Sequence, residues 1–183
     1  MVEIDKEFPK SYPFGVLKTL HWALPFALLI TLYVGTFQFG GVGFVLFSAW
    51  NAFFYSILTW FCYLFGFNKK VFNVGNAYLF IPFALMDFLV SIFFLLFFGI
   101  STLICIICIF ESFKYRFTVI LTYLFATAFS LGAAAAFGYF AILVYRACPN
   151  GQIRNLASLV IEGTTTATRP PADGPGEPGR PVV

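Results

Sequence analysis

Few residues of this chain have side chains that could do chemistry, and one of these residues lies in a strongly apolar stretch. Residues 81–98 read IPFALMDFLVSIFFLLFF and contain a single carboxylate, Asp87. On insertion scales, a charged aspartate at the centre of a membrane helix costs roughly 2.5–3.5 kcal/mol. If this stretch lies in lipid, Asp87 needs either a bound proton or a partner inside the protein.

Two basic side chains stand where they could reach Asp87. Lys18 and His21, the only histidine, stand near the start of the first apolar run. If the third run enters the membrane from the same side near Tyr78, Asp87 lies roughly 13 Å along its helix. Lys18 and His21 would lie less deep in the membrane, but within side-chain reach of Asp87. We therefore predict an intramembrane polar cluster of Asp87 with Lys18 or His21. This cluster would either hold the helices of the bundle together or form part of a transport or proton-relay path. Asn51 is a further candidate partner.

Composition indicates the elements that must position these residues. The chain is 60% hydrophobic and 10% charged, against about 25% charged in soluble domains. Its long uncharged runs predict an all-α fold, an integral membrane four-helix transmembrane bundle. The three glycines of QFGGVG (38–43) predict the first turn, and the third run is long enough to require a tilt or interfacial ends. The expected spans are about 16–37, 43–66, 78–104 and 118–145.

The chain divides into three parts. Residues 1–15 form a short charged segment, 16–147 the four-span domain and 148–183 a tail. In the tail, the spacing of Ile153, Leu156 and Val160 favours either a short helix on the membrane surface or a weakly structured segment. The Thr-, Pro- and Gly-rich remainder is expected to be a disordered cytoplasmic C-terminal tail, with P-x-x-P spacings that could dock a cytosolic partner.

The distribution of Lys and Arg predicts the orientation. Seven basic residues flank the spans on the side of the two termini, and two lie on the other side. Excess Lys and Arg marks the cytoplasmic face, so both termini are expected to be cytoplasmic, in the plasma membrane or a vesicle membrane. The net charge of +3 reflects this bias and does not indicate nucleic-acid binding. The seven are Lys6, Lys10, Lys18, Lys69, Lys70, Arg146 and Arg154; the two are Lys114 and Arg116.

Cysteines and small residues suggest further sites. Cys148, which follows Arg146 closely, and Cys62 are candidates for palmitoylation. Cys105 and Cys108 could form a disulfide or remain reduced. The last span carries two small-xxx-small pairs, which let helices approach closely, either within the monomer or between copies. These pairs are Gly132/Ala136 and Ala134/Gly138.

Several function classes find no support in the sequence. It contains no cluster with metal-ligand spacing, no nucleophile elbow and no phosphate-binding glycine loop. One histidine and one buried aspartate lack a candidate nucleophile to serve. We therefore predict a protein that is not an enzyme and that uses no cofactor.

The stretches IPFALMDFLVSIFFLLFF and YRFTVILTYLFATAFSLGAAAAFGYFAILVYR, with four spans and short outer loops, resemble the MARVEL-domain proteins over about residues 14–147. The chain lacks the loop cysteines of synaptophysin-type members, so the resemblance is to the chemokine-like-factor and plasmolipin branch. It implies a non-enzymatic membrane organiser in vesicle trafficking, membrane apposition or partner delivery. Such a protein contacts lipids and other membrane proteins laterally. The only matched position is Asp87.

Two other functions stay open. The chain could be an accessory subunit of a larger membrane complex, docked through the small-residue face of its last span. It could also be a small transporter or channel component that uses Asp87 and His21.

Overall fold

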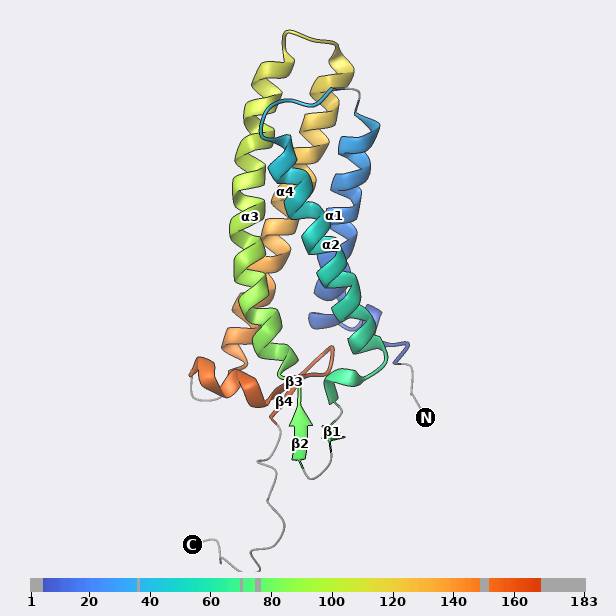
Figure 1. Cartoon of the computed structure of the whole chain (residues 1–183), viewed down its shortest axis with the longest axis vertical. Coiled ribbons are helices and arrows are strands. Elements are labelled where there is room, and N and C mark those ends of the chain that lie inside the picture. Colours follow the sequence, from blue (N-terminus) through green and yellow to red (C-terminus); the bar gives the residue numbers. More distant parts are fainter. Residues whose placement is uncertain (1–4, 36, 70, 75–76, 149–151, 169–183) are drawn as a thin grey trace, which may run out of the picture.

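The computed structural model describes residues 5–35, 37–69, 71–74, 77–148 and 152–168. Its main body is an antiparallel bundle of four helices (Figure 1). All four are long and apolar enough to cross a membrane, so the predicted four-span, integral membrane fold is confirmed. The helices are α1 (Phe14–Val34), α2 (Val42–Leu64), α3 (Phe83–Ser112) and α4 (Phe117–Arg146).

The third span differs most from its predicted bounds of 78–104. It begins later because β1 (Val71–Val74) and β2 (Ala77–Phe80) pair as an antiparallel hairpin, and Pro82 occupies the N-cap position of α3. It then continues to Ser112, which makes a helix of 30 residues, about 45 Å long. Asp87 is consequently only about 6 Å along its helix, not the roughly 13 Å that the sequence predicted.

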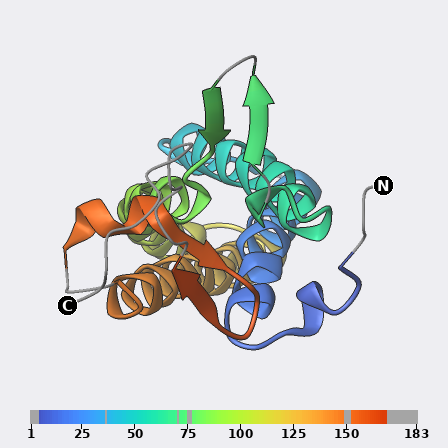
Figure 2. The same cartoon turned by 90° about the horizontal axis from the view of Figure 1, so that it is seen from below.

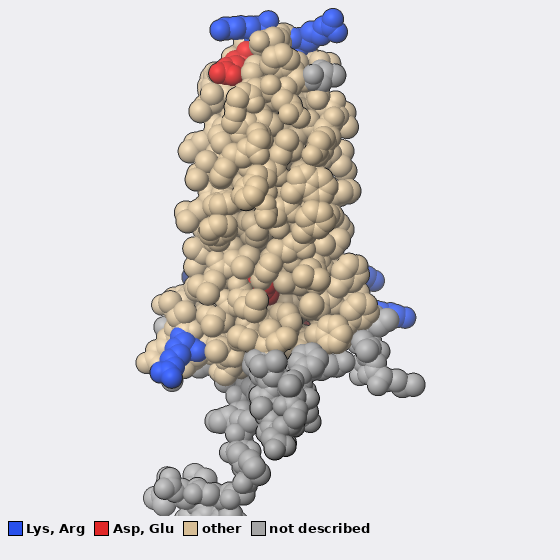
Figure 3. Space-filling model, in the orientation of Figure 1, with Lys and Arg blue, Asp and Glu red and all other residues tan. Residues whose placement is uncertain are grey.

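The helices form a ring in which consecutive helices contact each other, and α4 closes the ring by contacting α1 (Figure 2). The middle of the bundle is an apolar core that includes Leu28, Ala49, Phe98 and Phe137. Outward-facing side chains are mostly large and apolar as well. Figure 3 shows this surface as a broad uncharged band between two charged ends, as expected for a protein surrounded by lipid.

The α1–α2 connection lies between Val34 and Val42 and overlaps the predicted QFGGVG turn (38–43). Gly41 has φ 86°, a left-handed conformation that glycine adopts without steric cost. The buried Tyr123 of α4 supports this turn, because its hydroxyl accepts a hydrogen bond from the Phe39 N–H (3.3 Å) and donates one to the Phe37 carbonyl (3.0 Å). Irregular backbone near lipid needs such internal partners.

The segments before α1 and after α4 fold across the end of the bundle where α1 begins (Figure 2). The first contributes the 3-10 helix η1 (Phe8–Lys10), and η2 (Phe67–Lys69) follows α2. The second contributes η4 (Ile153–Ser158) and the antiparallel hairpin of β3 (Leu159–Ile161) and β4 (Thr166–Thr168). We call these segments, residues 5–13 and 152–168, the terminal cap.

The terminal cap corrects two expectations about the tail. The predicted surface helix through Val160 is instead a short 3-10 helix followed by a strand, and Leu156, Leu159 and Ile161 are buried against the bundle. The expected disorder does not apply to Thr166–Thr168, which pair as β4. The P-x-x-P spacings lie beyond residue 168, outside the described residues.

Candidate functional site

The bundle contains a buried ion pair that joins α1 to α3. Lys18 Nζ lies 2.6 Å from Asp87 Oδ1, and the two side chains are 2% and 1% exposed. Each is the fifth residue of its helix, so both lie about one turn from the same end of the bundle. Because α1 and α3 stand at opposite corners of the ring in Figure 2, the pair spans the bundle diagonally.

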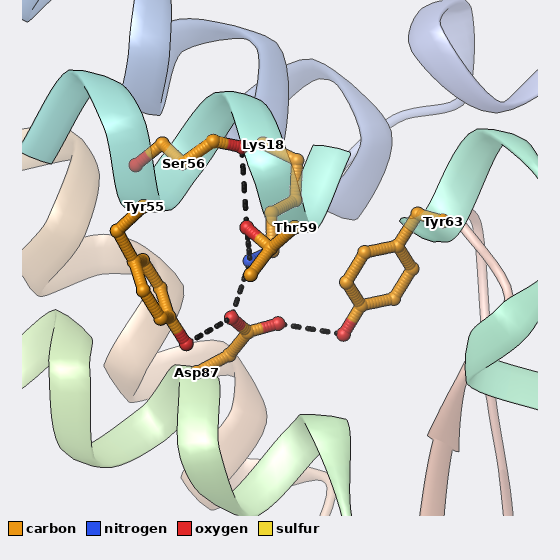
Figure 4. Close-up of polar contacts among 6 residues, drawn as sticks. All are labelled: Lys18, Tyr55, Ser56, Thr59, Tyr63 and Asp87. Carbon is orange, nitrogen blue, oxygen red and sulfur yellow. Dashed lines mark hydrogen bonds and ion pairs between the residues drawn. The ribbon is translucent and has the colours of Figure 1, made fainter. Parts of the chain in front are cut away.

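Helix α2 supplies the remaining partners of the ion pair (Figure 4). The Tyr55 hydroxyl donates to Asp87 Oδ1 at 3.1 Å, and the Tyr63 hydroxyl donates to Oδ2 at 2.7 Å. Lys18 Nζ also donates to Thr59 Oγ1 at 3.4 Å. We call Lys18, Tyr55, Thr59, Tyr63 and Asp87 the polar cluster.

The ammonium group lies over two aromatic rings. Lys18 Nζ lies 5.0 Å from the centroid of the Tyr63 ring and 5.3 Å from that of Phe140. Ring faces attract cations within about 6 Å, and more strongly when water is excluded. A buried ion pair has to recover the large desolvation cost of both ions through good geometry and further hydrogen bonds. Here both carboxylate oxygens and the ammonium have close partners.

The terminal cap covers the polar cluster at the end of the bundle. Phe8 stacks on Tyr63, with ring centroids 5.2 Å apart and an interplanar angle of 9°. The C-terminal part is held by two hydrogen bonds, from Asn68 Nδ2 to the Ile161 carbonyl (2.6 Å) and from the Phe14 N–H to the Gly163 carbonyl (2.9 Å). The cluster is therefore enclosed by side chains of the same chain.

The prediction of an Asp87 cluster is confirmed for Lys18 and wrong for its other two candidates. His21 is buried, but its ring stacks on Phe137 with centroids 4.0 Å apart, and its Nε2 has no hydrogen-bond partner among the described residues. It lies on α1 one turn beyond Lys18, on the side that meets α4. Asn51 faces outward and donates to the Phe47 carbonyl of its own helix.

The small residues of α4 pack within the monomer. A side chain at Gly132 would contact Leu24 of α1, and one at Gly138 would contact Leu95 of α3. Ala134 and Ala136 are buried. Of the two alternatives that the sequence left open, the structure shows the internal one, with α4 between α1 and α3.

The cysteines are all reduced. Cys105 and Cys108 are buried in the bundle without a disulfide, and Cys62 is half-buried. Cys148 is also buried, and its thiol donates to the Gln152 carbonyl at 2.8 Å. In this conformation the terminal cap shields Cys148 from modification, so its palmitoylation stays a prediction that requires the cap to open.

Sequence reasoning missed the three α2 residues of the polar cluster. Tyr55, Thr59 and Tyr63 recur at intervals of four, which places their side chains on one face of a helix. A stripe of hydroxyls in the terminal half of an apolar helix is a signal for a buried polar partner. It could have been read together with Asp87.

Among the described residues, no group of three or more His, Cys, Asp or Glu side chains lies close enough to hold a metal ion. Comparison of the chain with protein-family models, curated proteins and solved structures finds no match. The resemblance to MARVEL-domain proteins therefore stays a prediction, and function has to be argued from the polar cluster and the outer surface.

Proposed function

We propose that this protein is a non-enzymatic membrane organiser of MARVEL type. It would act in vesicle trafficking, membrane apposition or partner delivery through lateral contacts with lipids and other membrane proteins. The observation that carries the proposal is the closed polar cluster, in which the one carboxylate buried in the spans is bound by three donors of the same chain.

The partners of Asp87 favour a structural role for its charge. Its carboxylate binds Lys18 of α1 and the hydroxyls of Tyr55 and Tyr63 of α2, so it fastens three helices at one level. A transport role would require these contacts to break during each cycle. Removing one partner of a buried pair typically costs about 3–5 kcal/mol, which favours a permanent fastening.

The outer surface supports lateral action. Large apolar side chains project from all four helices, and several are more than half exposed, such as Phe54, Leu96, Phe125 and Ile142. A rigid body with such a surface orders the lipids around it and can pack against neighbouring helices through van der Waals contact. The work of the protein would then be physical and would occur within the bilayer.

We further propose that both termini are cytoplasmic, in the plasma membrane or in vesicles. Support comes from the basic residues: Lys6, Lys10 and Arg146 lie at the end with the terminal cap, and Lys114 and Arg116 lie in the short α3–α4 loop. Cysteines placed at residue 7 and at residue 115 test this orientation in intact cells. An impermeant maleimide should label only position 115, and labelling of position 7 alone would reverse the orientation.

A transporter or channel component is the second candidate, and one observation favours it. His21 Nε2 and Ser56 Oγ are buried polar atoms without hydrogen-bond partners among the described residues, and both belong to helices of the polar cluster. Such atoms can mark a path for water or ions. An accessory subunit has less support, because the α4 face expected to dock it is occupied inside the monomer.

Proximity labelling and flux measurements separate these functions. In its native membrane, an organiser should have many vesicle and plasma-membrane neighbours in no fixed ratio, whereas an accessory subunit should co-purify with one stoichiometric partner. In proteoliposomes, an organiser should give no ion or solute flux above protein-free vesicles. A flux abolished by Asp87→Asn, but retained in the outward-facing control Leu96→Ala, would overturn the proposal in favour of transport.

A further inference from the structure

Asn51 is a polar residue that the fold of a single chain does not explain. It is the only Asn or Gln in the four helices. It is the tenth of the 23 residues of α2, about 14 Å from the start of that helix, and thus near mid-membrane. Its side chain faces outward. In this monomer an amide would therefore contact the most apolar layer of the bilayer.

The amide of Asn51 is only partly satisfied. Its Nδ2 donates to the carbonyl of Phe47, one turn earlier, at 2.7 Å. Within the part of the chain that the structure describes, this is the only hydrogen bond of the side chain. The amide oxygen and the second N–H are left over, and each unsatisfied polar group in hydrocarbon costs several kcal/mol.

The residues around Asn51 form a surface that another helix can pack against. The outward stripe of α2 has intervals of four, three, four and three residues, the spacing of a helix–helix seam. Helix α3 exposes a stripe of similar spacing that is entirely apolar. Contact with lipid leaves none of its side chains without a hydrogen-bond partner. The α2 stripe is Phe47, Asn51, Phe54, Leu58 and Phe61; the α3 stripe includes Leu89, Phe93, Leu96, Ile100 and Leu103.

We propose that the outward face of α2 is a homodimer interface, in which Asn51 of one copy pairs with Asn51 of a second copy. A carboxamide has both a donor and an acceptor, so two of them can satisfy each other. Two copies inserted in the same orientation and related by a two-fold axis along the membrane normal present this residue at the same depth. A second copy is thus the partner that always carries a matching group.

The surroundings of Asn51 fit such an interface. Helix α2 lies in front in Figure 1, and Figure 3 shows this side of the molecule as part of the uncharged band. A copy approaching α2 therefore meets apolar and aromatic side chains, with one polar contact near the centre. In coiled-coil seams a single buried Asn sets register and oligomeric state. The inference uses a surface separate from the polar cluster and is independent of the proposed function.

The test measures association of the full chain in lipid vesicles. Donor- and acceptor-labelled copies should show energy transfer that falls on dilution with lipid. Asn51→Leu should raise the apparent dissociation constant about tenfold, the size expected from losing interhelical amide hydrogen bonds. Asn51→Gln should retain much of the association, and Leu96→Ala on α3 should leave it unchanged. Because Asn51 faces outward, Asn51→Leu should keep the fold, as checked by far- and near-ultraviolet circular dichroism.

Cysteine cross-linking locates the interface. In a chain whose four native cysteines are replaced by alanine, Phe54→Cys should form a disulfide-linked dimer and Leu103→Cys on α3 should not. A chain that is monomeric in pure lipid at all densities would overturn the proposal, as would cross-linking through α3 alone. Unchanged association of Asn51→Leu would also overturn it.

Discussion

At the scale of single residues, the polar cluster shows how a charge is held in an apolar bundle. The Asp87 carboxylate forms an ion pair with the Lys18 ammonium and accepts hydrogen bonds from two tyrosine hydroxyls. The ammonium also lies over two aromatic rings. Charged donors and acceptors form shorter and stronger hydrogen bonds than neutral ones, and the strength of each depends on the others in a network. The contribution of the cluster to stability should therefore not be the sum of its parts.

A double-mutant cycle on Lys18 and Asp87 tests this coupling. Lys18→Met leaves a buried carboxylate without its cation, and Asp87→Asn leaves a buried ammonium without its anion. Each should lower the free energy of unfolding by about 3–5 kcal/mol. The double variant should be less destabilised than the sum, because it buries no unpaired charge. Unfolding in mixed micelles by SDS titration measures this, and additive losses would show that the two charges act independently.

The two tyrosines should contribute unequally. Tyr63 is fully buried and donates at 2.7 Å, whereas Tyr55 is half-buried and donates at 3.1 Å. Hydrogen bonds to charged groups contribute about 1.5–3 kcal/mol, so Tyr63→Phe should cost an amount in this range and Tyr55→Phe less. The same SDS titration compares them. An equal or larger loss for Tyr55→Phe would mean that burial does not set their order.

At the scale of elements, the irregular segments depend on side chains that project from regular helices. The α1–α2 turn is held by Tyr123 of α4, and the terminal cap is held partly by Phe8 on Tyr63. These contacts join residues far apart in the sequence. Each connection would otherwise leave backbone groups or aromatic surface without partners near the membrane.

Tyr123→Phe tests the support of the α1–α2 turn. The change removes one hydroxyl and leaves the Phe39 N–H and the Phe37 carbonyl without that partner. We expect a loss of about 1–3 kcal/mol and faster hydrogen exchange at the Phe39 amide. Tyr145→Phe, on an exposed part of α4, is the matched control and should change neither quantity. Unaltered exchange at Phe39 in Tyr123→Phe would show that the turn is held by other contacts.

The sequence predicted the elements better than their connections. The four helices follow from uncharged runs longer than a bilayer is thick, and the Lys18–Asp87 pair follows from the cost of an isolated charge in lipid. The start of α3 was missed because residues 77–80 are apolar enough to continue a helix, yet pair with β1. The terminal cap was missed because the burial of Leu159 and Ile161 depends on the shape of the bundle end. A periodicity within the tail does not contain that information.

At the scale of the whole molecule, the two helical hairpins differ in length. Helices α1 and α2 have 21 and 23 residues, and α3 and α4 have 30 each. The polar cluster aligns them at one end, because Lys18 and Asp87 are each the fifth residue of their helix and Tyr63 is the last but one of α2. The excess length must therefore appear at the opposite end, where Figure 1 shows the α3–α4 hairpin rising above the α1–α2 turn.

This arrangement predicts different membrane depths for the two loops. From Asp87 to Phe113 is 26 residues and from Tyr63 back to Val42 is 21, a difference of about 7.5 Å at 1.5 Å per residue. The charged α3–α4 loop should thus lie in the headgroup region while the α1–α2 turn lies deeper.

Spin labels at Phe113→Cys and Gly40→Cys, in a chain without native cysteines, report this difference in depth through their relative accessibility to oxygen and to a polar nickel complex. Gly40 tolerates a side chain, since nothing lies within 4 Å of an added Cβ. The label at position 40 should favour oxygen and the one at position 113 nickel. Equal depths would contradict this arrangement and would mean that the bundle tilts enough to bring both loops to the same membrane surface.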